Sequence, residues 1–460
     1  MRFKAVNCML AIVAGALLSA CGLMHSPETS SMKPGQEPII FVHGNGDSQG
    51  LWITTAWRFE SNGWPPDRLF AFDLPHPVSR DLNDVPQQNR TSAEEYTAFL
   101  AARIEEVKRV TGASKVILVA NSRGGYPIRR FVRDGGAASV SDVILGGTPN
   151  HGVSVSTTVR FTNEYNGAGP WLSALNSPQG PAGAEEVTAG VRFLTLRSDH
   201  NDLYAQPTGI YFGAPQMETH VTPEGPALAG ATNIVLPGVD HRETAYSSAA
   251  FAQMWKFLTG VPPTYGVIDE PHPVVSGRIF GIDQQAPTNL PLPGTHVQIF
   301  VVDPATGKRI GAAVLETRVG EDGRWGPVTL DSKKRYEFAL DHPDYSIMHI
   351  YLGELSRSTN WLNFTPQPKP ATATADSVMQ FARPSGYFNT TRDVILLDGV
   401  TPKDIQTPVP SKSTATVTVP AAEAMRPVIA RYDDEVIVAP AWPGRDAGGA
   451  SQRVVAEMLD

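Results

Sequence analysis

The sequence of 460 residues contains only two cysteines, Cys8 and Cys21, and both lie in its first segment. The formal net charge is -8, and the cationic residues form no basic stripe, which argues against nucleic acid as a partner. No set of His, Cys, Asp and Glu residues has the spacing of a metal site, and no glycine-rich phosphate loop is present. We therefore expect a protein that uses neither a metal nor a cofactor.

The composition is that of a globular chain, with 41% hydrophobic and 18% charged residues. A chain of this length is too long for one ordinary domain, so we expect two or three. The 41 glycines and 39 prolines favour loops and short strands over a helical bundle. The sequence does not indicate an oligomeric state.

The first 21 residues have the features of a bacterial signal peptide. Arg2 and Lys4 precede an apolar stretch too short to span a bilayer, and small residues follow it. Residues 18–21, Leu-Ser-Ala-Cys, resemble a lipobox, which implies that Cys21 is lipidated and begins the mature protein; the alternative is an ordinary cleaved signal. With Cys8 removed and Cys21 acylated, no disulfide could form.

This N-terminus leads us to expect a location in the cell envelope. Two lipid groups on Cys21 would anchor the chain stably to a membrane. Gly22 follows the cysteine, where Asp commonly retains such proteins at the inner membrane, so the outer membrane of a Gram-negative bacterium is favoured. Without the anchor the protein would be secreted. Residues 22–37 are read as a tether to the folded part.

Short, continuous apolar runs recur between residues 38 and 262, at intervals that helices can fill. Such runs are typical of strands buried on both faces, and they predict a mainly parallel sheet covered by helices. The expected strands are Ile39–Val42, Leu69–Phe72, Val116–Val119, Val143–Leu145, Phe193–Leu196 and Ile234–Leu236. The clearest helix begins at a capping box of Ser92 and Glu95 and stops at Gly112. The fold class is therefore α/β.

The pattern of the sequence changes after Gly260, Pro262 and Pro263. Residues 263–365 contain β-type segments separated by turns and predict an all-β sandwich or barrel. Residues 366–460 are read as a further β-rich region that ends in a polar, fraying tail after Pro440. Within the first domain, residues 150–186 interrupt the β-α alternation, either as a cap over the site or as a surface excursion.

The strongest chemical signal is Lys115–Gly125, KVILVANSRGG, a buried strand, a tight turn with Ser122, and glycines that open a helix. A neutral serine is a poor nucleophile, so it needs an exposed position on a strained turn, close to a base. Small residues are required at Ala120 and Gly124 because strand and helix pack closely there. This pattern predicts Ser122 as a nucleophile.

A base and an orienting carboxylate should follow Ser122 along the chain. His241 ends a strand-loop segment, NIVLPGVDH, before the last helix of the domain, which favours it as general base over His220. Asp199 and Asp202 share one loop after a strand, and either could reach the imidazole. His43, in PIIFVHGNGDS, is read as a conformational residue. The order Ser, Asp, His is that of an α/β-hydrolase.

Residues 38–260 resemble the class 2 bacterial lipases, on the motifs PIIFVHGNG, VANSRGG, VILGGTPNHG and WLSALN. The resemblance implies backbone amides of Asn45 and Arg123 as oxyanion donors, and it favours Asp202 over Asp199 as the acid. The segments GTHVQIFVVDPATGKRI and EDGRWGPVTL resemble the C-terminal β-domain of an archaeal lipase. One departure is Asn121, where histidine is usual before the nucleophile.

These patterns predict the hydrolysis of carboxylic esters, such as acylglycerols or related lipids, through an acyl-enzyme on Ser122. One alternative is a depolymerase for polyesters of the polyhydroxyalkanoate type, which needs the same triad. Another is a non-catalytic surface binding module that retains a degenerate hydrolase fold. The expected partners are thus a lipid or ester substrate and, through Cys21, a membrane.

Overall fold

The computed structural model describes residues 37–179, 184–284 and 286–459. The expected signal peptide, Cys21 and nearly all of the expected tether lie outside these ranges. Among the described residues, no helix combines the length and the apolar character needed to cross a membrane.

The N-terminal part of the described chain is built on one six-stranded sheet. Its strands are β1 (Ile39–Val42), β2 (Leu69–Ala71), β3 (Val116–Asn121), β4 (Val140–Gly146), β5 (Arg192–Ser198) and β8 (Thr232–Leu236). They pair in the order β2-β1-β3-β4-β5-β8, and every pair is parallel. All six expected strands and the parallel sheet are therefore confirmed, and the carboxyl ends of the strands share one edge.

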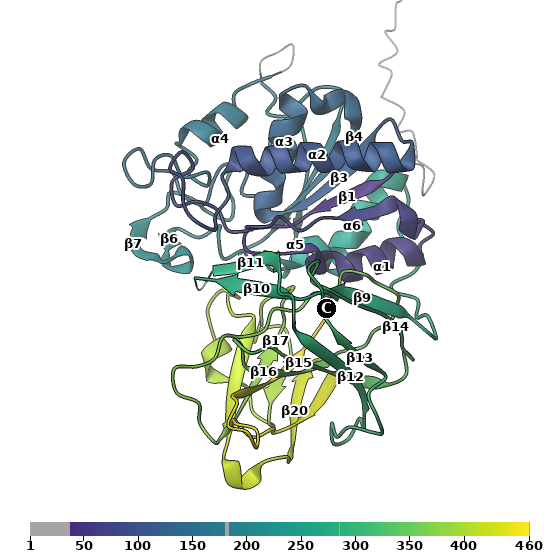
Figure 1. Ribbon diagram of the computed structural model, residues 1–460. Coiled ribbons are helices and arrows are strands. Elements are labelled where there is room, and N and C mark those ends of the chain that lie inside the picture. The colour runs from purple at the N-terminus through teal and green to yellow at the C-terminus, as the bar shows by residue number, and fades with distance from the viewer. Residues whose placement is uncertain (1–36, 180–183, 285, 460) are drawn as a thin grey trace, which may run out of the picture. The chain divides into compact units, whose positions relative to one another are not determined.

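Helices cover both faces of this sheet, as Figure 1 shows. Ile39 and Phe41 of β1 belong to a hydrophobic cluster with residues of α1 (Ile53–Ser61) and α6 (Ser248–Thr259). Ile40 and Val42 belong to a second cluster, with residues of α2 (Ala93–Thr111) and α3 (Gly125–Arg133). Because successive side chains of a strand point to opposite faces, a strand between two helical layers must be apolar throughout.

The expected helix after Ser92 is confirmed as α2. The Ser92 hydroxyl accepts a hydrogen bond from the Glu95 amide, and the Glu95 carboxylate accepts one from the Ser92 amide, so the capping box is complete. Gly112 ends the helix with a φ of 68°, a left-handed conformation that glycine adopts without strain.

The C-terminal part consists mostly of β-strands, as expected. Its largest sheet has seven strands in the order β13-β12-β15-β16-β22-β17-β19. They are β12 (His296–Val302), β13 (Leu315–Arg318), β15 (Arg335–Asp341), β16 (Ile347–Leu352), β17 (Ser377–Ala382), β19 (Thr414–Val419) and β22 (Gln452–Glu457). Smaller sheets pair β9 (Val274–Arg278) with β14 (Arg324–Thr329), and β18 (Ile395–Leu397) with β20 (Pro427–Tyr432) and β21 (Glu435–Pro440).

Two expectations about the C-terminal part are wrong. The division at residue 365 does not separate two sheets, because one sheet continues from four strands of 263–365, which end at β16, to three strands of 366–460, which begin at β22. The tail after Pro440 does not fray: β22 lies between β16 and β17 and is parallel to both. Val454, Val455 and Ala456 are buried there, so the last strand joins two parts of the sheet.

Near the expected boundary at residue 262 the chain changes from α/β to mostly β structure, but the hydrophobic core is not interrupted there. Gly260 ends α6 with a φ of 81°, as its sequence context indicated. However, one hydrophobic cluster runs from the sheet and α6 into the β-rich part, where it includes Trp325 and Phe338. Phe41 of β1 contacts Trp361 edge to face, with 6.1 Å between ring centroids.

Candidate active site

Ser122 lies on the turn between β3 and α3, in a single turn of 3-10 helix, Ser122–Gly124. Its φ of 53° is in the left-handed region, which is rare for a residue other than glycine and typical of strained functional turns. A Cβ atom at Gly124 would lie 2.5 Å from the carbonyl oxygen of Val42. The turn therefore packs so closely on β1 that residue 124 must be glycine.

His241 lies in the loop between β8 and α5 (Glu243–Tyr246), and its Nδ1 is 3.0 Å from Oδ2 of Asp202. Oδ1 of Asp202 accepts a hydrogen bond from the Tyr204 amide at 2.8 Å, which fixes the carboxylate. The Tyr204 ring packs edge to face on the imidazole, with 4.7 Å between centroids. A carboxylate at Nδ1 favours the tautomer with the proton there, so Nε2 becomes the acceptor.

The Nε2 atom of His241 is buried and has no hydrogen-bond partner among the described residues. Ser122 and His241 line the same cavity. The nucleophile candidate and the histidine with a free acceptor nitrogen therefore border one cavity, although the two groups are not hydrogen-bonded to each other. In the absence of substrate, such catalytic contacts are commonly longer than in the reacting complex.

The residues weighed against Asp202 and His241 have other contacts. Asp199 accepts hydrogen bonds from the amide of Gly238, at 2.8 Å, and from Asn201. The side chain of His220 is 59% exposed and lies beside Glu218. In the described part of the chain neither side chain makes a hydrogen bond to Ser122 or His241, so the geometry favours Asp202 and His241.

His43 is held as a neutral residue, in keeping with the conformational role expected from the sequence. Its Nδ1 donates to the carbonyl oxygen of Gly44 at 2.9 Å, and its Nε2 accepts from the Leu74 amide at 3.1 Å. Burial lowers the pKa of His43. Both nitrogens are thus used to shape the loop that carries Asn45.

Of the two expected oxyanion donors, Asn45 lines the cavity. Oδ1 of Asn45 accepts a hydrogen bond from the Ser79 amide at 2.7 Å, which fixes the loop after β1. The Arg123 guanidinium is buried and forms an ion pair with Glu164, with Nε 2.5 Å from Oε1. The Arg123 side chain is thus committed to Glu164, and Arg123 is not among the described residues that line the cavity.

Asn121, the departure from the usual histidine, ties three elements together. Its Nδ2 lies 3.2 Å from the His241 carbonyl oxygen, 3.2 Å from Oγ1 of Thr244 and 3.3 Å from the Gly146 carbonyl oxygen. The side chain is buried. Asn121 therefore holds the backbone of the histidine loop against the end of β4.

The cavity above Ser122 has a volume of about 330 Å³. One wall comes from residues 150–186, the segment read from the sequence as either a cap or a surface excursion. This segment contributes Val153, Ser154, Val159, Arg160, Asn163 and Tyr165. It is attached to the nucleophile turn through the buried Glu164–Arg123 pair. The first part of the segment therefore borders the site, as a cap would.

Two further walls come from residues that the sequence reading missed. Tyr211, Phe212, Ala214 and Met217 lie on or beside the hairpin of β6 (Thr208–Gly209) and β7 (Ala214–Glu218). The apolar pair Tyr211-Phe212, between the acid and the base in sequence, was an available signal. Tyr387 comes from the C-terminal part, and no local pattern marks it.

Among residues 37–179, 184–284 and 286–459, no group of three or more His, Cys, Asp or Glu side chains is arranged to hold a metal ion. The chemistry that the cavity can support from its own side chains is nucleophilic attack by a hydroxyl, with a histidine as proton acceptor.

The parallel sheet, its helices on both faces and the strand-turn-helix at Ser122 define an α/β-hydrolase-like fold with a β-rich C-terminal part. Residues 36–169 match the family of class 2 lipases, and residues 274–369 match the lipase C-terminal domain. The similarity of both parts to lipases, expected from the sequence motifs, is therefore confirmed. The match supports a lipolytic hydrolase that acts on esters.

Several solved structures are similar to the chain. The mature form of Bacillus licheniformis lipase BlEst2 has 22% identity and a TM-score of 0.36, over 49% of this chain and 94% of that one. A Paleococcus ferrophilus monoacylglycerol lipase has 14% identity and a TM-score of 0.33, over 50% and 96%. Phospholipase PlaB from Legionella pneumophila has 12% identity and a TM-score of 0.33, over 72% and 94%.

Proposed function

We propose that the protein is a serine hydrolase that cleaves carboxylic esters through an acyl-enzyme on Ser122. One observation carries this proposal: Nδ1 of His241 contacts Asp202, its buried Nε2 has no hydrogen-bond partner among the described residues, and His241 lines the same cavity as Ser122. A histidine oriented in this way is prepared to accept a proton from a neighbouring hydroxyl.

In the first half of the reaction, Oγ of Ser122 bonds to the ester carbonyl carbon, and its proton passes to Nε2 of His241. The carbonyl oxygen becomes an oxyanion, and in this proposal the backbone amides of Asn45 and Arg123 stabilise it. When the C–O bond to the alcohol breaks, His241 returns the proton to the leaving alcohol. Asp202 stabilises the imidazolium and maintains its orientation throughout.

In the second half, a water molecule takes the place of the alcohol. His241 accepts a proton from this water while its oxygen bonds to the acyl carbon. The bond to Ser122 then breaks, His241 returns the proton to Oγ, and the acid leaves. The atoms balance as ester plus water giving acid plus alcohol.

The cavity favours substrates with a short or medium acyl chain. Its volume of about 330 Å³ is near the lower end of the usual range for ligand pockets, roughly 300–1,000 Å³. Tyr211, Phe212 and Met217 give it an apolar wall. In a series of p-nitrophenyl esters, kcat/KM should peak at short or medium chains, and Phe212→Ala should move the peak to longer ones. An unchanged peak would contradict this preference.

The test of the proposed function compares wild type with Ser122→Ala on p-nitrophenyl butyrate. We expect kcat to fall by about 10⁴-fold or more, because the nucleophile is lost while the fold is retained. Ser173→Ala, on the exposed side of α4 (Pro170–Leu175), is the matched control and should retain full activity. Hydrolysis at the wild-type rate by Ser122→Ala would refute the proposal.

A further inference from the structure

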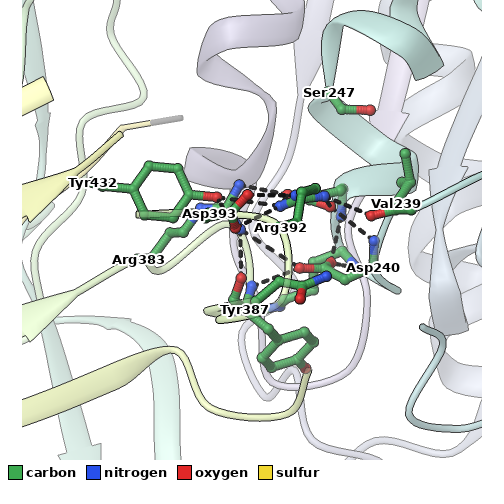
Figure 2. A network of polar contacts seen from close by, with 12 residues as sticks. Val239, Asp240, Ser247, Arg383, Tyr387, Arg392, Asp393 and Tyr432 are labelled. Carbon is green, nitrogen blue, oxygen red and sulfur yellow. Dashed lines mark hydrogen bonds and ion pairs between the residues drawn. The ribbon is translucent and has the colours of Figure 1, made fainter. Parts of the chain in front are cut away.

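The loop that carries His241 is held from outside by the C-terminal part of the chain. The loop comprises Gly238–Glu243, and the segment that contacts it, residues 383–393, lies between β17 and β18. We call residues 383–393 the clasp. Figure 2 shows Arg383, Tyr387 and Arg392 of the clasp close to Asp240 of the loop, with Asp393 and Tyr432 beside Arg392.

Arg392 of the clasp bridges the two ends of the histidine loop. Its Nη1 donates to the Gly238 carbonyl oxygen at 2.6 Å and to Oε2 of Glu243 at 2.8 Å, and its Nη2 donates to Oε1 of Glu243 at 2.7 Å. Asp393 binds the same guanidinium, with Nε 2.5 Å from Oδ1, and the Tyr432 hydroxyl donates to Asp393 at 2.6 Å. The two hydrogen bonds between the Arg392 guanidinium and the Glu243 carboxylate form a bidentate pair, which fixes the orientation of the Arg392 side chain.

The middle of the loop is also held by the clasp. The Tyr387 amide donates to Oδ2 of Asp240 at 2.7 Å, and Nη1 of Arg242 donates to the Pro384 carbonyl oxygen. Arg383 donates from Nη2 to Oε1 of Glu243 at 2.6 Å. Residues 238, 240, 242 and 243 thus all contact the clasp, and His241 lies among them.

The charges make this contact necessary for the loop. Asp240 is 0% and Glu243 3% exposed, and the ion pairs that Glu243 makes in the described part of the chain are with Arg383 and Arg392. Desolvation raises the pKa of Glu243, but hydrogen bonds from Arg392 and the charge of Arg383 outweigh it, so the pKa is below its ordinary value. Without the clasp, the loop would bury a carboxylate without a cation, which is strongly unfavourable.

We propose that the clasp is a positioning element for His241, with Arg392 as its main positioning residue, so that the C-terminal β-rich part completes the active site. This inference rests on the proposed function. It also assigns a reason for Tyr387 in the cavity wall: the same segment that fixes the histidine loop borders the substrate.

The test uses the full chain with Arg392→Gln, Arg392→Lys and a matched control, Arg357→Gln. Arg357 joins the same two parts of the chain elsewhere, through Glu60 at 3.1 Å, and also pairs with Glu270 at 2.9 Å within the C-terminal part. It does not border the cavity. We expect Arg392→Gln to lower kcat by at least about tenfold with KM nearly unchanged, because misplaced catalytic groups lose rate more than binding. Arg392→Lys should be intermediate, since lysine cannot form the bidentate contact. Arg357→Gln should retain kcat.

Hydrogen exchange of a peptide covering residues 236–246 gives a readout that does not depend on turnover. Its amides should exchange faster in Arg392→Gln than in wild type, and at the wild-type rate in Arg357→Gln. If wild type is active and Arg392→Gln shows the same kcat and the same exchange rates as wild type, the positioning role of the clasp is refuted, while the proposed function stands. A wild type that neither hydrolyses esters nor reacts with a fluorophosphonate would overturn the proposed function, and the clasp with it.

Discussion

Replacing Asn121 by leucine should weaken both the fold and catalysis, because the Asn121 side chain ties the nucleophile strand to the histidine loop. Leucine has nearly the same size, so the change removes polar contacts without a large cavity. Nδ2 of Asn121 faces the carbonyl oxygens of His241 and Gly146 and Oγ1 of Thr244 at 3.2 to 3.3 Å. The side-chain amide of Asn121 has only two N–H groups. At most two of the three acceptors can therefore each receive a hydrogen bond from an N–H group of their own.

The expected loss of stability follows from the number of hydrogen bonds removed. Two buried hydrogen bonds contribute about 1 kcal/mol each to stability, so Asn121→Leu should lower the free energy of unfolding by about 2 kcal/mol. The His241 carbonyl oxygen keeps a second donor, the Thr244 hydroxyl at 2.7 Å, so the loop should shift without unfolding. A shift of about 1 Å in His241 would lower kcat by roughly 10²-fold.

Urea unfolding and kcat on p-nitrophenyl butyrate measure the two effects. The control is Asn62→Leu, because Nδ2 of Asn62 also donates to two carbonyl oxygens, those of Arg58 and Tyr265, both at 2.8 Å. Asn62 does not border the cavity. The control should lose similar stability and retain kcat. If Asn121→Leu lost stability but kept the wild-type kcat, Asn121 would not position His241.

Three other changes have defined outcomes. Asp202→Asn should lower kcat by about 10⁴-fold, as loss of the orienting acid does in other triads, whereas Asp199→Asn should have a small effect. If Asp199→Asn lowered kcat of ester hydrolysis more than Asp202→Asn, Asp199 would be the orienting acid. Desolvation raises the pKa of Glu457 from 4.5 to about 7, so the folded state holds this proton more tightly and loses the resulting stability as the pH rises through 7. Glu457→Gln should therefore be more stable than wild type by about 3 kcal/mol at pH 8 and about equal at pH 4.5. Equal unfolding free energies of the two proteins at both pH values would contradict this. Cys21→Ser should abolish lipid labelling and move the protein from the membrane pellet to the soluble fraction of expressing cells. If the variant still sedimented with membranes, Cys21 would not be the anchor.

Local rules made the catalytic half of the fold predictable from sequence. Continuous apolar runs identified the strands because a strand between two helical layers needs apolar residues on both faces. The Ser122 turn was recognisable because nearby backbone atoms limit residue 124 to glycine, a constraint confined to a few residues and β1. Asp202 and His241 could be selected because each follows a strand of the parallel sheet and so reaches its carboxyl edge.

Long-range contacts were not predictable in the same way. The clasp lies about 150 residues after His241 in the chain, and the ion pair of Arg392 with Glu243 leaves no periodic pattern in either segment. The last strand, β22, was read as part of a polar tail because the Gly and polar residues before it dominate the composition. Its short apolar core, residues 454–456, becomes a strand because β16 and β17 offer unpaired edges on both sides.

The most direct test of the account is the site of covalent labelling by a fluorophosphonate. Mass spectrometry of the intact wild-type protein should show one adduct, and peptide mapping should locate it on Ser122. The rate of labelling should fall sharply in His241→Ala, because the hydroxyl then lacks its proton acceptor. Ester hydrolysis by a wild-type protein whose adduct maps to another residue, or that forms no adduct, would contradict the assignment of Ser122 as the nucleophile.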